Sequence, residues 1–212
     1  MRKIIVLLTV VSTVLMLQAK TLMLLDFESD ADLKKIELTA EPIRVNPIEI
    51  GGIPGQDAVV NCDPVKDFDP SVLPCERVSE NATSGKSALK VTDKPKAGNI
   101  HFIGFPKDWT GYPYLKLDIF NPSSELASLV IVLTDLATRP DKRYTNSIGT
   151  YQTRADITKN LKPGMNSIII ELEGLTNNEK LGQLDLAKMQ KLAIDVQGKS
   201  YALDNVRLDS EE

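Results

Sequence analysis

The sequence has very little of two residue types on which many catalytic and metal sites depend. Of its 212 residues, one is histidine and two are cysteine. The histidine, His101, has no nucleophile partner that the sequence identifies, and the chain has neither a Gly-x-Ser-x-Gly elbow nor a phosphate-binding glycine loop. We therefore expect a protein that is not an enzyme. The alternative is a small polysaccharide-active hydrolase or lyase, which would need two of the 29 acidic residues to face each other.

An excess of positive charge is also absent. The 25 Lys and Arg residues are outnumbered by 29 Asp and Glu, which gives a net charge of -4, and no basic stripe follows the chain. Binding to a nucleic-acid backbone needs such a stripe, so the sequence argues against that class of partner. A hydrophobic content of 42% is that of an ordinary globular protein, and the length suits one sizeable domain.

Long apolar runs are missing except at the N-terminus. There, Arg2 and Lys3 precede an apolar run over residues 4–17, and Gln18-Ala19 follows it. This order is typical of a secretory signal peptide, and we predict cleavage after Ala19. The alternative is a retained anchor, although the run is shorter than the roughly 20 residues of a comfortable membrane span. We expect a secreted, periplasmic or cell-surface protein with no membrane span after residues 1–19 are removed.

The two cysteines, Cys62 and Cys75, lie in or beside a stretch that is rich in proline and glycine. Residues 41–76 contain six prolines and three glycines, which predicts a long insertion with at most short strands. Export favours a disulfide between the two cysteines, worth about 3 kcal/mol in the chain-entropy model. The alternative is two buried or free thiols. We expect a single domain over residues 20–212 that carries this insertion.

Short strand-like runs separated by turn signals fill most of the remaining chain. Residues 115, 117 and 119 are apolar and alternate with Lys116, Asp118 and Phe120, as in a strand with one buried face. Residues 33–38 fit either a strand or a helical turn, and one helical turn is expected near residues 184–188. The predicted strands are residues 21–27, 77–79, 88–92, 100–103, 114–120, 129–134, 144–150, 167–172, 191–196 and 201–208. This pattern predicts an all-β protein, a sandwich or barrel.

Three segments resemble galactose-binding-like domains and the calcium-binding carbohydrate-binding modules of extracellular bacterial polysaccharide degraders. They are Leu-Asp-Phe-Glu at residues 25–28, Thr-Ser-Gly-Lys-Ser-Ala-Leu-Lys-Val at 83–91 and Tyr-Ala-Leu-Asp-Asn-Val-Arg-Leu at 201–208. The segments 108–112, 117–122 and 161–166 are also similar to this group. Together they span most of residues 22–208 outside the insertion. The resemblance implies an antiparallel jelly-roll β-sandwich whose first and last strands lie side by side.

The same resemblance implies a structural calcium ion between the first and last strands. Calcium binds six to eight oxygens from carboxylates and backbone carbonyls. Glu28 and Asp204 would supply side-chain oxygens, carbonyls around Ser84 and Lys86 would complete the shell, and Asp26 is a further candidate. The alternative is that Glu28 caps the following turn and Asp204 only accepts backbone hydrogen bonds.

Aromatic residues make up only 5% of the chain, although sugar-binding surfaces depend on them. Tyr144 and Tyr151, on a polar segment, are the candidates for an exposed face. Trp109, the single tryptophan, fits either a sugar platform or a packing role at the sandwich edge, and we favour packing. The residues expected to bind a ligand are Tyr144, Tyr151, Arg143, Asn146, Asp118 and Trp109.

We therefore expect an exported carbohydrate-binding protein that grips a glycan or polysaccharide without altering it. The alternative is a structural or protein-interaction domain of the same fold at the cell surface. Because one fold hosts many functions, this step rests on the resemblance.

Overall fold

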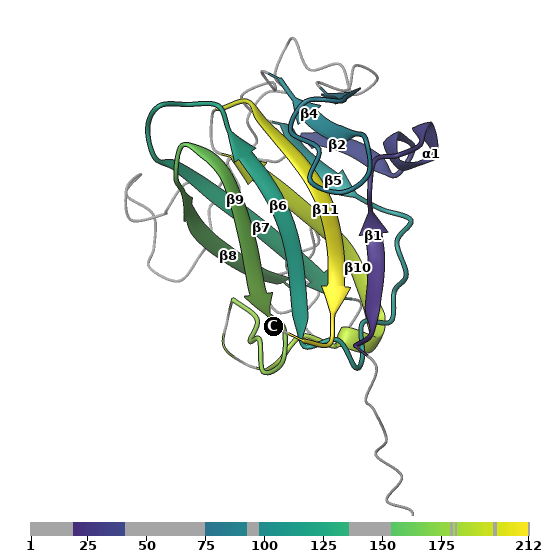
Figure 1. Cartoon of the computed structure of the whole chain (residues 1–212). Coiled ribbons are helices and arrows are strands. Elements are labelled where there is room, and N and C mark those ends of the chain that lie inside the picture. Colours follow the sequence, from purple (N-terminus) through teal and green to yellow (C-terminus); the bar gives the residue numbers. More distant parts are fainter. Residues whose placement is uncertain are drawn as a thin grey trace, which may run out of the picture.

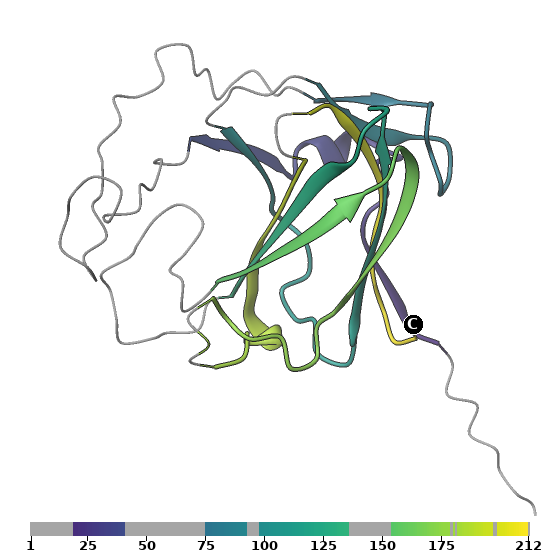
Figure 2. The same ribbon diagram turned by 90° about the vertical axis from the view of Figure 1, so that its left-hand side faces the viewer.

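Two antiparallel β-sheets make up the computed structural model, which describes residues 19–40, 75–92, 98–135, 154–178, 180, 182–196 and 199–211. The sheets form the two layers of a sandwich (Figure 1; Figure 2). This confirms the predicted all-β fold. In the described part of the chain, no helix is long and apolar enough to cross a membrane.

The first sheet has six strands, ordered β3-β4-β11-β6-β9, with β1 beside β11. Its strands are β1 (Thr21–Leu25), β3 (Cys75–Val78), β4 (Ala88–Val91), β6 (Tyr114–Asn121), β9 (Gly164–Glu171) and β11 (Tyr201–Asp209). The last strand, β11, therefore lies in the middle of the sheet, with β6 along one side.

The second sheet has five strands, ordered β2-β5-β10-β7-β8. Its strands are β2 (Ile36–Ala40), β5 (Gly98–Phe102), β7 (Ala127–Asp135), β8 (Arg154–Leu161) and β10 (Met189–Val196). A short helix, α1 (Asp30–Leu33), precedes β2, and a 3-10 turn, η2 (Leu186–Lys188), precedes β10. The segment 33–38 thus resolves into the end of a helical turn followed by a strand, and the helical turn expected near 184–188 is confirmed.

The core lies between the sheets and follows the alternation of each strand. Leu115, Leu117 and Ile119 of β6 are buried, while the residues between them are only half-buried. In β7, Leu129, Ile131 and Leu133 belong to the main core. Val132 is buried on the opposite face of β7, where it packs with its cross-strand partner Ala193. The strand β7 therefore buries side chains on both of its faces, although Val130 is only half-buried.

The first and last strands pair directly, as the resemblance implied. Thr21 lies opposite Asp209, and Leu25 lies opposite Val206 (Figure 1). Beyond the strands, the backbone N–H of Lys20 donates to Ser210 Oγ at 2.8 Å, and the Lys20 carbonyl accepts from the Ser210 N–H at 3.0 Å. These two bonds continue the pairing of the two chain ends beyond the strands.

Several expectations fall partly or wholly outside the described residues. They concern the leader over residues 1–18, the insertion up to residue 74 and the strand predicted at 144–150. One strand that the sequence analysis did not identify, β8, lies at the edge of the second sheet. Of its eight side chains, four are exposed and two are half-buried. Only Ala155 and Leu161 are buried.

Candidate functional site: the seam on the last strand and its outer face

The last strand changes its neighbour halfway along its length. Residues 201–203 of β11 pair with β4, whereas residues 206–209 pair with β1. Asp204 lies at this seam, and the pairing of β11 with β6 is irregular between Asp204 and Arg207. Asn205 follows with a φ of +54°, a left-handed conformation that asparagine tolerates better than most residues. A bulge of this kind redirects side chains at the point where β11 changes its partner from β4 to β1.

Asp204 uses its carboxylate to hold the turn that leads into β4. Its Oδ2 accepts hydrogen bonds from the backbone N–H groups of Thr83 at 2.6 Å and Ser84 at 2.8 Å. The Thr83 hydroxyl lies 3.1 Å from the same oxygen, and Oδ1 accepts from the Asn205 N–H at 2.7 Å. The residue is only 1% exposed, so water cannot reach its carboxylate. These donors supply the hydrogen bonds that water would otherwise make.

Glu28 holds the other half of the same turn. Its Oε1 accepts hydrogen bonds from the backbone N–H groups of Lys86 at 2.7 Å and Ser87 at 2.8 Å. These two bonds, together with the charge of Arg77, hold the pKa of Glu28 below its ordinary value. Arg77 of β3 also donates to the Glu28 carbonyl at 2.9 Å. We call Glu28, Asp204 and the turn 83–87 the clasp.

A glycine allows Glu28 to approach the turn so closely. Gly85 has a φ of +66°, and a Cβ placed on it would lie 2.5 Å from Glu28 Oε1. Any side chain at residue 85 would therefore both strain the backbone and collide with the carboxylate.

The contacts of the clasp do not fit the calcium ion that the resemblance implies. Glu28 Oε1 and both oxygens of Asp204 accept N–H donors, so among the four carboxylate oxygens of these two acids only Glu28 Oε2 accepts no hydrogen bond in the described contacts. Asp26 Oδ1 accepts from the Glu28 N–H at 3.1 Å. Across the described ranges, no group of three His, Cys, Asp or Glu side chains is placed to hold a metal. Asp204 accepts backbone hydrogen bonds, as the alternative stated, whereas the Glu28 carboxylate accepts from the turn at residues 83–87 and not from the turn that follows it.

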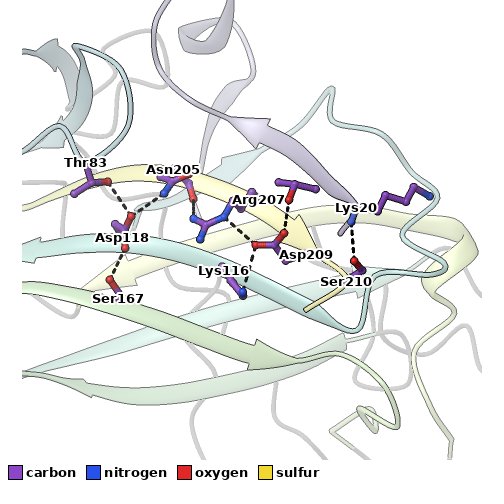
Figure 3. A network of polar contacts seen from close by, with 10 residues as sticks. Lys20, Thr83, Lys116, Asp118, Ser167, Asn205, Arg207, Asp209 and Ser210 are labelled. Carbon is purple, nitrogen blue, oxygen red and sulfur yellow. Dashed lines mark hydrogen bonds and ion pairs between the residues drawn. The ribbon is translucent and has the colours of Figure 1, made fainter. Parts of the chain in front are cut away.

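Asp118 of β6 lies on the outer face of the six-stranded sheet, directly opposite Asp204. Its oxygens accept hydrogen bonds from Ser167 Oγ at 2.6 Å, Thr83 Oγ1 at 2.8 Å and Asn205 Nδ2 at 2.9 Å (Figure 3). Partial burial disfavours the charged form, but these three donors outweigh it and lower the pKa of Asp118. The structure thus brings Asp118 next to the clasp, through Thr83.

The polar row continues along β11 toward the chain ends. Asp209 Oδ2 lies 3.3 Å from Lys116 Nζ and 3.1 Å from Arg207 Nε, and its Oδ1 accepts from the Thr21 hydroxyl (Figure 3). Burial alone would raise the pKa of Asp209, but the bonds from Thr21, Lys116 and Arg207 lower it. Asp209 is therefore paired with both neighbouring cations.

Exposed apolar side chains flank this row on the same face. Met165 and Ile169 of β9 lie opposite Phe120 and Lys116, and Met23 of β1 lies opposite Arg207. The three are 44%, 41% and 37% exposed, respectively.

Trp109 is a core residue, so its prediction as a sugar contact is corrected. The side chain is 0% exposed, its ring lies 5.5 Å from that of Phe105, and its Nε1 donates to the Pro106 carbonyl at 2.8 Å. A buried indole cannot present its face to a ligand, and the packing interpretation that we favoured is confirmed.

The remaining predicted ligand residues, Tyr144, Tyr151, Arg143 and Asn146, lie outside the described residues. Their segment joins β7 to β8, both in the five-stranded sheet, whereas Asp118 belongs to the six-stranded sheet. The structure describes Asp118 and not the other four, so their grouping in one site stays a prediction. The partners of Asp118 were missed by sequence reasoning; an Asp-Asn pair at 204–205 was the available signal for the bulge.

Cys75 is half-buried and forms no disulfide with a described residue, and burial raises the pKa of its thiol to about 11. Cys62 lies outside the described residues, so the disulfide between them stays a prediction.

Comparison with known proteins shows similarity of structure only. No protein family and no curated protein sequence matches the chain. A family 11 carbohydrate-binding module from Clostridium thermocellum, solved with a β-1,3-1,4-mixed-linked tetrasaccharide, has a TM-score of 0.51 and 14% identity, over 89% of this chain and 94% of that one. The solution structure of CtCBM11 has a TM-score of 0.54 and 13% identity, over 91% and 96%.

An exo-β-agarase also matches, with a TM-score of 0.54 and 15% identity over 90% of this chain. This chain spans only 25% of the length of that enzyme, and the same share of the agarase AgWH50C. The chain therefore has the jelly-roll β-sandwich fold of carbohydrate-binding modules, and it aligns with such modules over almost their whole length.

Proposed function

We propose that this protein is a non-catalytic module that binds a glycan or polysaccharide outside the cell. The observation that supports this most is the similarity to the family 11 module, which extends over about nine tenths of both chains, whereas the enzymes are similar over a quarter of their length. The family 11 module was solved with a mixed-linked tetrasaccharide, so β-1,3-1,4-glucans are the first ligands to test.

The proposed binding residues belong to the segment between β7 and β8. Tyr144 and Tyr151 supply aromatic faces for the C–H patches of a sugar, and Arg143 and Asn146 supply planar polar groups for its hydroxyls. Tyr151 is three residues before Arg154, whose Nε and Nη2 bond to Asp156 at 2.5 and 3.0 Å. Asp118 is less suited to a sugar because its oxygens already accept three hydrogen bonds.

Affinity gel electrophoresis tests this proposal. The protein should be retarded in a gel that contains mixed-linked β-glucan or agarose, relative to a gel without polysaccharide. Tyr144→Ala should lose the retardation. Tyr114→Ala, which changes the outer face of the six-stranded sheet, should keep it. Migration that is the same in every gel, or retardation lost equally in both variants, would count against the proposed site.

A second candidate function is a protein-interaction domain at the cell surface. It is supported by the exposed Met23, Met165 and Ile169 on the outer face of the six-stranded sheet. Asp209 on this face is paired with Lys116 and Arg207, and the oxygens of Asp118 accept three hydrogen bonds, so covering the face would leave neither acid without partners. Absence of binding to every polysaccharide tested, with capture of a surface protein that Ile169→Lys abolishes, would favour this function.

Export is part of the proposal. Because the backbone of Lys20 is already bonded to Ser210, cleavage after Ala19 would leave the whole described fold intact. The intact mass of the protein recovered from outside the cytoplasm should correspond to residues 20–212, and a mass that retains residues 1–19 would indicate an anchor.

A further inference from the structure

Four backbone N–H groups of the turn before β4 find their acceptors in two carboxylates that are distant in sequence. Thr83 and Ser84 donate to Asp204, and Lys86 and Ser87 donate to Glu28. The turn precedes β4, so these donors do not take part in the strand ladder. Backbone groups left without acceptors would cost free energy, and each carboxylate therefore satisfies two of them.

The clasp joins segments from both ends of the chain. Glu28 follows β1, Asp204 lies at the seam of β11, and Arg77 of β3 donates to the Glu28 carbonyl while its Nη2 lies 3.1 Å from Asp30 Oδ1. The Thr83 hydroxyl contacts both Asp204 and Asp118, which extends the connection to β6. These contacts thus connect β1, β3, β6, β11 and the turn before β4 at one place in the six-stranded sheet.

A cation and these N–H groups would compete for the same oxygens. Calcium binds through oxygen lone pairs, and it is repelled by the positive end of an N–H dipole. In the clasp, Glu28 Oε1 accepts two N–H groups and Asp204 Oδ2 accepts two more, so the turn itself supplies the positive charge that the acids need.

We propose that the clasp is a metal-free substitute for the calcium ion of the modules that this chain resembles, so that the fold is stable without calcium. The backbone amides of residues 83–87 occupy the place of the cation, and Glu28 and Asp204 act as acceptors of hydrogen bonds. This inference does not depend on glycan binding.

Thermal unfolding of the full chain in EDTA and in millimolar calcium chloride tests the proposal. The two melting temperatures should agree within about 1 °C, because a ligand that does not bind the folded state cannot stabilise it. A calcium-dependent rise of several degrees, abolished by Glu28→Gln, would overturn the proposal. Calorimetric titration of the wild-type chain with calcium chloride gives an independent readout, in which saturable binding would also contradict it.

Substitutions at Glu28 distinguish an amide acceptor from a metal ligand. Glu28→Gln keeps a carbonyl oxygen that can accept from Lys86 and Ser87, so it should keep most of the stability, whereas Glu28→Ala should lower the melting temperature by about 4 °C. Equal loss in both variants would show that the charge, and not the acceptor, matters. Glu76 is a matched control, because it is exposed and pairs only with Lys90 in the described contacts; Glu76→Ala should have a much smaller effect.

Discussion

Asn205 of β11 donates from its side-chain amide to Asp118 of β6, at 2.9 Å, and it does so from a backbone with a φ of +54°. The left-handed conformation costs free energy for a residue with a side chain, but it turns the amide toward the neighbouring strand. The hydrogen bond and the strain therefore oppose each other at one residue.

Two substitutions at Asn205 separate these effects. Asn205→Ala loses the hydrogen bond and keeps the unfavourable φ, so it should lower the free energy of unfolding by about 1–2 kcal/mol. Asn205→Gly loses the same bond but removes the strain, so its cost should be clearly smaller. Urea unfolding measures both, and a glycine variant that is as destabilised as the alanine variant would contradict this interpretation.

Gly85, in the turn at residues 83–87, should tolerate no side chain. Gly85→Ala imposes an unfavourable φ and pushes Glu28 away from the amides that it holds, so we expect a loss of about 2 kcal/mol or more. Gly111 is the matched control, since it has a φ of +78° but nothing lies within 4 Å of an added Cβ. Gly111→Ala should cost only the strain, about 1 kcal/mol. Equal losses in denaturant unfolding would show that the contact with Glu28 is unimportant.

Stability should fall in acid because five carboxylates have pKa values lower in the folded protein than in the unfolded chain, and three of them belong to the clasp and the outer face. These three are Glu28, with an ordinary value of 4.5, and Asp118 and Asp209, each with 3.8. Their contribution is present above these ordinary values and is lost as the pH falls through the folded values. The melting temperature should be nearly constant from pH 7 to about 5 and decrease below about pH 4.

Asp26 acts in the opposite direction, since burial raises its pKa and favours the protonated form in the folded protein. Its contribution is present at low pH and is lost as the pH rises through the folded value, so it offsets part of the acid loss.

Asp118→Asn should flatten the acid limb of the melting curve. A limb of unchanged steepness in this variant would show that other groups govern acid unfolding.

Trp109 should matter for stability and not for ligand binding. Trp109→Ala leaves a large cavity beside Phe105 and should cost about 3–5 kcal/mol. Trp109→Phe should cost less and should leave glycan affinity unchanged. The tryptophan fluorescence maximum of the wild-type protein should be that of a buried indole and should not shift when a glycan is added; a shift on binding would place the ring at the ligand.

The sequence predicts the strands that bury one face or both faces. It does not predict a strand that buries few side chains. The alternation around Leu117 and the apolar run at 129–133 identify β6 and β7 because each buries a regular set of side chains. In β8, only two of the eight side chains are buried, so no apolar period marks it. An edge strand of this kind is recognised only through its pairing with β7.

The candidate site was predictable in its acids and not in their partners. Glu28 and Asp204 were identified from short motifs, and the strand pairing of Leu25 with Val206 confirms that these motifs meet in space. Their hydrogen-bond donors are backbone N–H groups, which every residue except proline carries, so the sequence could not distinguish amides from a cation. Only the seam on β11 shows which of the two the acids face.

Calorimetric titration of the protein with a β-1,3-1,4-mixed-linked tetrasaccharide, combined with a reducing-end assay of the same sample, tests the central claim most directly. We predict saturable binding of the tetrasaccharide with no new reducing ends after prolonged incubation, and loss of the heat in Tyr144→Ala. New reducing ends, or the absence of heat with this and every other oligosaccharide tested, would contradict the claim that the protein binds a glycan without changing it.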